Sequence, residues 1–525
     1  MTASIVRPRR ARRRACVRRS ARAFAFAFCA LAAAACADRT LAPPVDDAVP
    51  PEVRAAASDW PLPGRDYRNS RATFDSPIRA SSFGRLAVAW EAVLPARGAY
   101  GAASTTPLVL GDTVYIQDLQ SDVLALDRAT GAERWRKIYN LFTVGPNGVA
   151  VGWGKLYANK GTRDLAALDL ATGEEIWTRT LPRTPTEGID IQPTVYANLV
   201  FASTVPVSLN GIYQPGDRGV LHALDDATGA TVWSFDTVPA DLWGHPEVNS
   251  GGGSWFPPAI DRERGRILWG IANPAPFPGT PEFPNGTSRP GPNLYTESLV
   301  ALDVRSGALD WYRQAIQHDI FDHDLVHALL VDVNAGGTTR TVAVATGKLG
   351  RVIGHDRDTG ELLWETPVGV HRNDELTALT GPTAVLPGTF GGVITPPAAA
   401  NGVVYVATIN APTTLSPNQP AYIGSQFGTM PGEVVAIDAA TGAILWDVEV
   451  DGDPFGGATV VNDLVLTATF QGSITALDRA TGREVGRIAA AGGMNGWPAI
   501  AGDTIFWPVG LADPPRLVAY RLGAG

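Results

Sequence analysis

The sequence predicts an all-β protein built as an eight-bladed propeller, and three observations support this fold class. The chain has 525 residues, too many for one compact core of ordinary size unless repeats build that core. Its 56 glycines and 41 prolines are too frequent for a helical protein and too few for a disordered chain. One eleven-residue pattern also recurs seven times, which indicates a repeat architecture.

The repeated pattern is Ala-x-Asp-x-x-x-Gly-x-x-x-Trp, usually with Thr-Gly at its centre. Successive copies start 42, 56, 78, 53, 82 and 40 residues apart. The short spacings approach the roughly 40–45 residues of a four-stranded propeller blade, so the long spacings indicate a blade with an insertion. The copies start at Ala125, Ala167, Ala223, Ala301, Gly354, Ala436 and Ala476. The last copy has Gly486 where Trp is expected.

Each copy has a readable physical role. An apolar strand such as Val123–Leu126 ends at Asp127, whose side chain can cap backbone N–H groups of the following turn. Gly131 permits a positive φ in that turn. Trp135 then follows on the next strand, where a large flat side chain suits the gap between adjacent blades. We therefore interpret these Asp, Gly and Trp residues as structural rather than catalytic.

The eighth blade is expected to combine the two ends of the domain. Leu86–Leu94 carries Trp90 without a preceding repeat, and Leu517–Leu522 is a strand without a following Trp. Pairing these two segments would close the ring and remove its exposed sheet edges. The predicted propeller extends over residues 59–525.

The N-terminal region predicts export from the cytoplasm. Residues 1–35 contain nine arginines and no acidic residue, and the apolar run Ala23–Ala35 is 13 residues long, shorter than a membrane span of about 20. This pattern is typical of a signal peptide. Cys36 follows three alanines and resembles a bacterial lipoprotein cleavage site, so lipidation at Cys36 and simple cleavage both stay open. Residues 36–58 are rich in Pro and acidic residues and are expected to form an extended tether.

Charge and cysteine content exclude several classes of function. After residue 35 the chain has 34 basic and 52 acidic residues, a net charge of −18, which argues against nucleic-acid binding. All three cysteines lie within the first 36 residues, so the propeller has no disulfide and no thiolate metal site. The expected location is the periplasm, free or tethered to the membrane.

The insertions are expected to carry the chemistry, because a ring of identical blades does not need them. The 78-residue spacing between the third and fourth repeats contains the segments Gly251–Trp255 and Ala272–Phe277. Trp255 is out of register with the blade tryptophans. Gln317–Asp324 follows, and five of its eight residues are His or Asp. Buried carboxylates need a cation or hydrogen-bond donors, and Asn and Asp oxygens suit an ion like Ca²⁺. Each segment taken alone also has a purely structural interpretation. Gln317–Asp324 could be a solvated acidic loop, Trp255 a core aromatic residue and Asn273 a turn residue.

Together, the repeats and the insertion motifs resemble the quinoprotein alcohol dehydrogenases. The resemblance runs from Asp59 to the end of the chain and is nearest to the polyvinyl-alcohol-dehydrogenase-like branch. It implies an enzyme that oxidises an alcohol with pyrroloquinoline quinone (PQQ), a tricarboxylate, and a Ca²⁺ or lanthanide ion. This chain contains no Cys-x-x-Cys-His motif for haem attachment, so a separate electron acceptor is expected.

Family roles are implied for several residues of the insertions. Trp255 resembles the tryptophan on which the quinone stacks, and Asn273 resembles a metal ligand. Asp322 resembles the catalytic base and a further metal ligand. Asp324 resembles a second carboxylate that accompanies lanthanide use in some members. Lys348, one of only four lysines in the chain, resembles the basic residue that reaches the quinone oxygens.

Other positions match the family less closely. Arg218, with the next glycine, resembles a cofactor-binding Arg-Gly pair. Gln214 stands where a glutamate metal ligand is expected, which would remove one negative charge from the metal site. Ser104 lies near the position of an expected acidic residue, and the adjacent-cysteine disulfide of many members is absent.

Two alternatives come from other functional classes. The outer-membrane β-barrel assembly lipoprotein is an eight-bladed scaffold with the same repeats, and an anionic, cysteine-free propeller fits it equally well. A propeller that kept its pocket but lost its cofactor is the second alternative. The insertions favour the dehydrogenase, because a scaffold does not need them.

Overall fold

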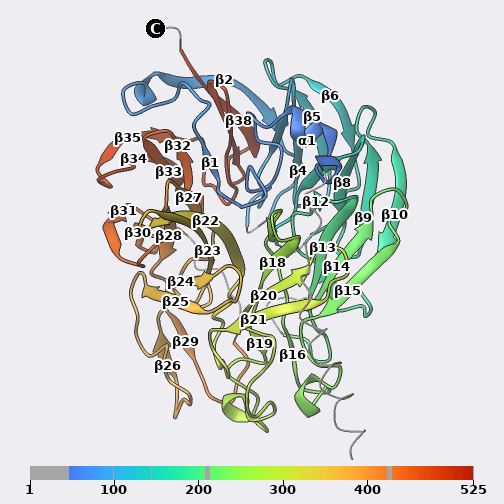
Figure 1. The fold of residues 1–525 in the computed structure, drawn as a ribbon, viewed down its shortest axis with the longest axis vertical. Coiled ribbons are helices and arrows are strands. Elements are labelled where there is room, and N and C mark those ends of the chain that lie inside the picture. Colours follow the sequence, from blue (N-terminus) through green and yellow to red (C-terminus); the bar gives the residue numbers. More distant parts are fainter. Residues whose placement is uncertain (1–45, 99, 144, 207–212, 422–427, 524–525) are drawn as a thin grey trace, which may run out of the picture. The chain divides into compact units, whose positions relative to one another are not determined.

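Strand pairing in the computed structural model follows the repeats. The structure describes residues 46–525 except 99, 144, 207–212, 422–427 and 524–525. Eight antiparallel sheets succeed one another along the chain as the blades of a propeller (Figure 1). The first four blades are β3–β6 (Leu108–Leu110, Thr113–Gln117, Val123–Asp127, Glu133–Lys137), β7–β10 (Val149–Gly152, Lys155–Lys160, Asp164–Asp169, Glu175–Thr180), β12–β15 (Thr194–Tyr196, Leu199–Pro206, Val220–Asp225, Thr231–Asp236) and β17, β18, β20 and β21 (Ala259–Asp261, Arg266–Ile271, Ser298–Asp303, Leu309–Gln314).

The remaining blades repeat this pattern, and few other elements accompany them. They are β22–β25 (His327–Ala335, Thr338–Thr346, Arg351–Asp356, Leu362–Pro367), β27, β28, β30 and β31 (Ala398–Ala400, Val403–Ile409, Gly432–Asp438, Ile444–Val450), β32–β35 (Thr459–Val461, Leu464–Ala468, Ser473–Asp478, Glu484–Ala489) and β36–β38 with β2 (Ala499–Ala501, Thr504–Val509, Arg516–Leu522, Leu86–Val93). The short strands are β1 (Ala72–Thr73), β11 (Glu187–Ile189), β16 (Ser250–Gly251), β19 (Pro274–Ala275), β26 (Thr383–Val385) and β29 (Thr413–Leu415). The helical segments described are η1 (Asp46–Ala48), α1 (Pro51–Ala55), η2 (Phe83–Arg85), η3 (Leu242–Gly244) and η4 (Pro284–Gly286).

The predicted closure of the ring is confirmed. β2 pairs antiparallel with β38 over their whole length, from Leu86 opposite Leu522 to Val93 opposite Arg516. Figure 1 shows the two strands side by side, one blue and one red. The last blade therefore takes three strands from the C-terminal end of the propeller and one from its beginning.

The repeat tryptophans hold neighbouring blades together. A Cβ atom at Gly131 would lie 2.5 Å from the Trp90 ring of the preceding blade, so only glycine allows this contact. The Trp90 indole N–H also donates to the carbonyl of Arg128 at 3.0 Å. The same contact joins Trp135 to Gly173, Trp177 to Gly229, Trp233 to Gly307, Trp311 to Gly360, Trp364 to Gly442 and Trp446 to Gly482.

The turn chemistry predicted for each repeat is also present. Asp127 Oδ1 accepts hydrogen bonds from the backbone N–H of Ala129 and Thr130 and from the Thr130 hydroxyl. Gly131 follows with φ of +74°. At the junction without Trp, the ring of Phe83 on η2 lies beside Gly486 instead. The missing tryptophan is thus replaced by an aromatic residue from the N-terminal part of the domain.

The tether prediction for residues 36–58 is wrong from Asp46 onward. η1 and α1 occupy this stretch, and the side chains of Val49 and Val53 are buried in a hydrophobic cluster of the propeller. The Glu52 carboxylate accepts hydrogen bonds from the backbone N–H of Trp153 and Gly154. The segment folds because it supplies apolar side chains and a capping carboxylate. The predicted signal peptide and Cys36 lie outside the described residues.

The described part of the chain contains no helix long and apolar enough to span a membrane.

Replacing Trp135 by Ala should act on folding. Removing a large packed aromatic side chain costs about 3–5 kcal/mol, because the contact with Gly173 and the hydrogen bond to the Leu170 carbonyl are lost together. Thermal and urea unfolding would measure the change, with the exposed Phe142→Ala as a control expected to stay within about 0.5 kcal/mol. A Trp135→Ala protein with parental stability would contradict the docking role.

Candidate active site

One cavity of about 280 Å³ collects most of the residues that the sequence singled out. Its lining includes Trp255, Asn273, Asp322, Asp324, Lys348 and Gln214. Many lining residues occupy equivalent positions in their blades, three or four residues before the innermost strand. These are Ser104, Pro146, Asp190, Trp255, Asp324, Thr395, Phe455 and Asn495. Because each precedes an innermost strand, all eight blades contribute to the cavity.

Asn273, Lys348 and Gln214 reach the same cavity by a second route. Each follows the second strand of its blade, namely β18, β23 and β13. In an antiparallel pair the end of the second strand lies beside the start of the first. The two kinds of position therefore meet at one end of the propeller.

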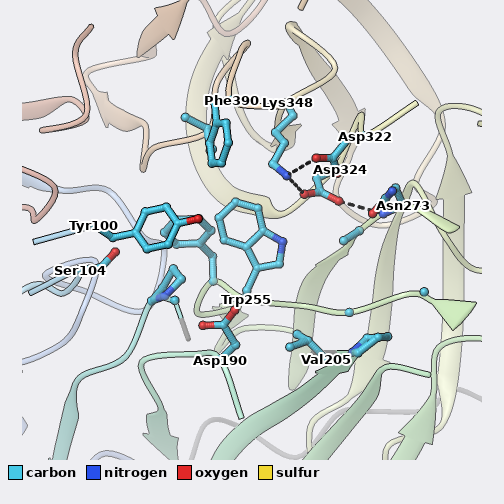
Figure 2. A pocket seen from close by; sticks show the side chains of 18 of the residues that line it. Tyr100, Ser104, Asp190, Val205, Trp255, Asn273, Asp322, Asp324, Lys348 and Phe390 are labelled. Carbon is cyan, nitrogen blue, oxygen red and sulfur yellow. Dashed lines mark hydrogen bonds and ion pairs between the residues drawn. The ribbon is translucent and has the colours of Figure 1, made fainter. Parts of the chain in front are cut away.

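Lys348 is the electrostatic centre of the site. Its ammonium lies 3.0 Å from Asp322 Oδ2, 2.7 Å from Asp324 Oδ2 and 5.3 Å from the centroid of the Trp255 ring (Figure 2). A cation over an indole face is attracted by the ring quadrupole. One buried positive charge thus holds two carboxylates and the aromatic ring in a fixed arrangement.

The charge states of this cluster follow from burial and pairing. Burial raises the pKa of Asp322 to about 7, although the Lys348 ammonium opposes the shift. Burial alone would lower the pKa of Lys348, but the carboxylates of Asp322 and Asp324 outweigh it and raise that pKa. Lys348 therefore stays charged, while Asp322 can exchange a proton near neutral pH.

Asn273 is tied to the same carboxylates. Its backbone N–H donates to Asp324 Oδ1 at 3.0 Å, and its amide Nδ2 donates to the carbonyls of Pro274 and Phe321. These bonds orient the amide group. Among the described residues no group of three His, Cys, Asp or Glu side chains could hold a metal ion. The oxygen donors expected to serve as metal ligands are the two carboxylates with Asn273 and Gln214, a hard set with only two negative charges.

The His- and Asp-rich segment is not a solvated loop. Asp319, Asp322, His323 and Asp324 are all buried. Asp319 lies 3.1 Å from the imidazole of His323 and accepts the backbone N–H of Phe321. Burial tends to raise the pKa of Asp319, but these partners hold it below its usual value. Asp319 and His323 therefore support the segment from behind, while Asp322 and Asp324 face the cavity.

The assignment of Arg218 as a cofactor-binding residue stays a prediction. Its guanidinium lies 3.9 Å from Asp236, and its side chain is not among those that line the cavity. The neighbouring Gly219 packs against the backbone of Gly252, where a Cβ atom would clash. Arg218 also forms a backbone bridge with Gly251, a residue that lines the cavity, so the Arg-Gly pair positions the Gly-rich turn before Trp255.

Sequence reasoning missed three residues that Figure 2 places around Trp255. Tyr100 and Phe390 line the cavity, with ring centroids 6.5 Å apart. Asp190 lines it as well, on the connection between β11 and β12. None of the three belongs to a motif, but the position of Asp190 four residues before an innermost strand is the one that Trp255 also occupies.

Comparison with known families points to two propeller groups. The family described as "Glucose/ethanol/alcohol dehydrogenase, beta-propeller domain" matches residues 60–144 and 187–391, more than half of the chain. The family of the outer membrane protein assembly factor BamB matches residues 119–253 and 431–513. The second match leaves out the whole stretch from Trp255 to Lys348. The blades that the two families share therefore explain the BamB match, and the insertions agree with the alcohol dehydrogenase family.

Individual relatives agree with the first family. The chain is 26% identical over 504 residues to quinohemoprotein alcohol dehydrogenase of Comamonas testosteroni, covering 82% of this chain and 69% of that protein. It is 25% identical to the putative dehydrogenase XoxF of Paracoccus denitrificans, covering 84% of each. It spans 49% of quinohemoprotein alcohol dehydrogenase ADH IIB of Pseudomonas putida, with 29% identity.

Solved structures show the same fold. The crystal structure of the Comamonas testosteroni enzyme superposes with a TM-score of 0.77 at 23% identity, covering 90% of this chain and 82% of that one. A europium-containing methanol dehydrogenase gives 0.73 at 19% identity, covering 90% and 100%. BamB from Moraxella catarrhalis gives 0.53 at 16% identity, covering 84% and 98%. With its insertions and its family match, the chain belongs to the quinoprotein alcohol dehydrogenases of the glucose/ethanol/alcohol dehydrogenase β-propeller family.

Proposed function

We propose that this protein oxidises an alcohol to a carbonyl compound with PQQ and a Ca²⁺ or lanthanide ion bound in the cavity. One observation carries the proposal: Trp255, Lys348, Asp322 and Asp324 converge there from separate insertions. A scaffold propeller has no use for a buried, charged cluster of this kind, since burying charge is costly.

The residues present fit both groups. The Trp255 face offers a platform for a planar ring, and the oxygen donors of Asn273, Asp322, Asp324 and Gln214 suit a hard cation. When bound, the quinone supplies a two-electron acceptor and the metal ion supplies a Lewis acid. The alternative of a propeller that has lost its cofactor does not explain why two carboxylates are buried beside one ammonium group.

Each residue of the cluster has a chemical role in this proposal. Asp322, with a pKa near neutrality, takes the proton of the alcohol hydroxyl as a general base. Lys348 keeps its charge and stabilises negative charge that develops beside it. Trp255 and the aromatic residues Tyr100 and Phe390 keep the reacting groups away from bulk water. In this proposal the substrate is a primary, secondary or polymeric alcohol, and the electrons leave to a separate acceptor.

Replacing Asp322 by Asn should abolish dye-linked alcohol oxidation and leave the fold intact, because an isosteric amide cannot accept the proton. In the parent, kcat/KM should rise with pH up to the pKa of Asp322, since the base must be ionised; that pKa is about 7 in the metal-free protein, and a bound cation lowers it. The exposed Asp241→Asn serves as a matched control. Parental activity in Asp322→Asn would remove this residue from the mechanism.

Replacing Gln214 by Glu should tighten Ca²⁺ binding, because Ca²⁺ affinity follows the charge of its ligands. Asp324→Ala should weaken La³⁺ binding more than Ca²⁺ binding, since a trivalent ion gains more from each carboxylate. Calorimetry with PQQ present, titrating Ca²⁺ and then La³⁺, measures both effects. Gln419→Glu adds the same charge at an exposed position and should change nothing. Equal Ca²⁺ affinity of Gln214→Glu and the parent would exclude residue 214 as a ligand.

We also propose that the protein acts in the periplasm and that Cys36 anchors it to the membrane by lipidation. The arginine-rich start, the apolar run and the three alanines before Cys36 support this proposal. Palmitate labelling in a bacterial host should be lost in Cys36→Ala and kept in Cys16→Ala. Equal labelling of the two variants would exclude the lipid anchor.

A further inference from the structure

Asp190 is a partly exposed residue of the cavity wall for which neither the repeats nor the resemblance has a role. Its carboxyl group lines the cavity, and its Oδ1 atom is buried without a hydrogen-bond partner. In Figure 2 it lies on the opposite side of the Trp255 indole from Lys348, Asp322 and Asp324. A buried polar atom without a partner is costly, so this oxygen is suited to a ligand in the cavity.

The backbone around Asp190 is held rigidly in place. Gln192 donates from Nε2 to the carbonyls of Thr106 and Val149, at 2.9 and 3.0 Å, and accepts the Thr106 N–H. The carbonyl of Ile191, itself buried, accepts the Asn159 amide at 3.0 Å. These bonds tie the connection to two neighbouring blades. The Asp190 carboxyl group therefore keeps its aim into the cavity.

Gly145 closes the other side of the carboxyl group. A Cβ atom there would lie 2.5 Å from Asp190 Oδ1 and 2.7 Å from Oδ2. Burial raises the pKa of Asp190 to about 7, opposed by a backbone hydrogen bond from Gly145 and by the charge of Lys348. The other titratable groups that line the cavity are Tyr100, Tyr213, Asp322 and Asp324. The neutral acid is thus accessible near pH 7.

The charge balance of the cavity gives this neutral form a purpose. Lys348 is the one basic side chain among the described lining residues, and it is already shared by Asp322 and Asp324. A ligand that carries carboxylates would meet a third negative charge if Asp190 were ionised. A protonated carboxyl group removes that repulsion and offers an O–H donor.

We propose that Asp190 binds the cofactor as a neutral acid, donating a hydrogen bond from its carboxyl group to a carboxylate of the planar ring stacked on Trp255. This inference rests on the proposed function, because it takes PQQ as the ligand. Binding is then linked to the uptake of a proton. The bound anion raises the pKa of Asp190 further, so affinity is complete below the pKa of the free protein. It falls by about tenfold per pH unit as pH rises from there to the pKa of the complex.

The test uses metal-free protein and PQQ alone, between pH 6 and 8.5. Quenching of tryptophan fluorescence gives the Kd, and calorimetry in two buffers of different ionisation enthalpy gives the number of protons taken up. The parent should take up about one proton more than Asp190→Asn at pH 8, because an amide donates without titrating. The slope of log Kd against pH should also be smaller in Asp190→Asn than in the parent, by about one logarithmic unit per pH unit.

Control variants separate Asp190 from the other acids. Asp453→Asn alters a buried acid whose pKa burial also raises but which does not line the cavity, so it should keep the parental proton uptake. Asp322→Asn should keep the part of the pH dependence that Asp190 contributes. Asp190→Ala has no donor, so it should bind PQQ at least tenfold more weakly than the parent at pH 6.

The outcomes distinguish the two proposals. Equal proton uptake by Asp190→Asn and the parent, with PQQ bound by both, would overturn the role of Asp190 and leave the proposed function standing. Parental affinity of Asp190→Ala at pH 6 would overturn that role as well. If no protein in the series binds PQQ at any pH, the proposed function fails and this inference fails with it.

Discussion

The contact between a tryptophan ring and a glycine of the next blade is the interaction on which the structure depends. The ring lies where a side chain would begin, so the two blades approach more closely than any other residue would allow. The glycine also adopts a positive φ, which the turn after the Asp of each repeat requires. One residue type thus satisfies the turn and the packing at once. Repeated around the ring, this contact leaves the axial end of the blades free to carry other residues.

The site exploits that freedom. The segments that precede the innermost strands and those that follow the second strands all converge on one end of the propeller, whatever their sequence. Blade geometry therefore brings Trp255, Asp324 and Lys348 together although they lie in separate segments of the chain. The buried ammonium of Lys348 then locks the two carboxylates, and each element of the site stabilises the others. A rigid cluster of this kind is preorganised for chemistry rather than assembled by the ligand.

Sequence reasoning reached the fold because the repeats encode local turn chemistry and a fixed docking residue. Trp255, Asn273, Asp322, Asp324 and Lys348 could be found because motifs surround them. The sequence does not show which way the Arg218 side chain points, and in the structure its guanidinium lies near Asp236. Asp190 lies in no motif, and its significance depends on register, which needs the exact start of β12. The composition of residues 46–58 predicts an extended tether, yet they fold because Val49 and Val53 pack into a hydrophobic cluster of the propeller.

The pairing of β2 with β38 has a consequence for how the chain reaches its native state. The strand that closes the ring is synthesised first, and its partner is synthesised last, more than 400 residues later. Until then β2 and the newest blade both present unpaired backbone, the kind of edge that recruits other strands. Contacts so distant in sequence form slowly. Newly made protein is therefore most vulnerable to aggregation in the interval before its C-terminal strand emerges, and a helper that shields β2 during this interval would improve the yield of closed rings.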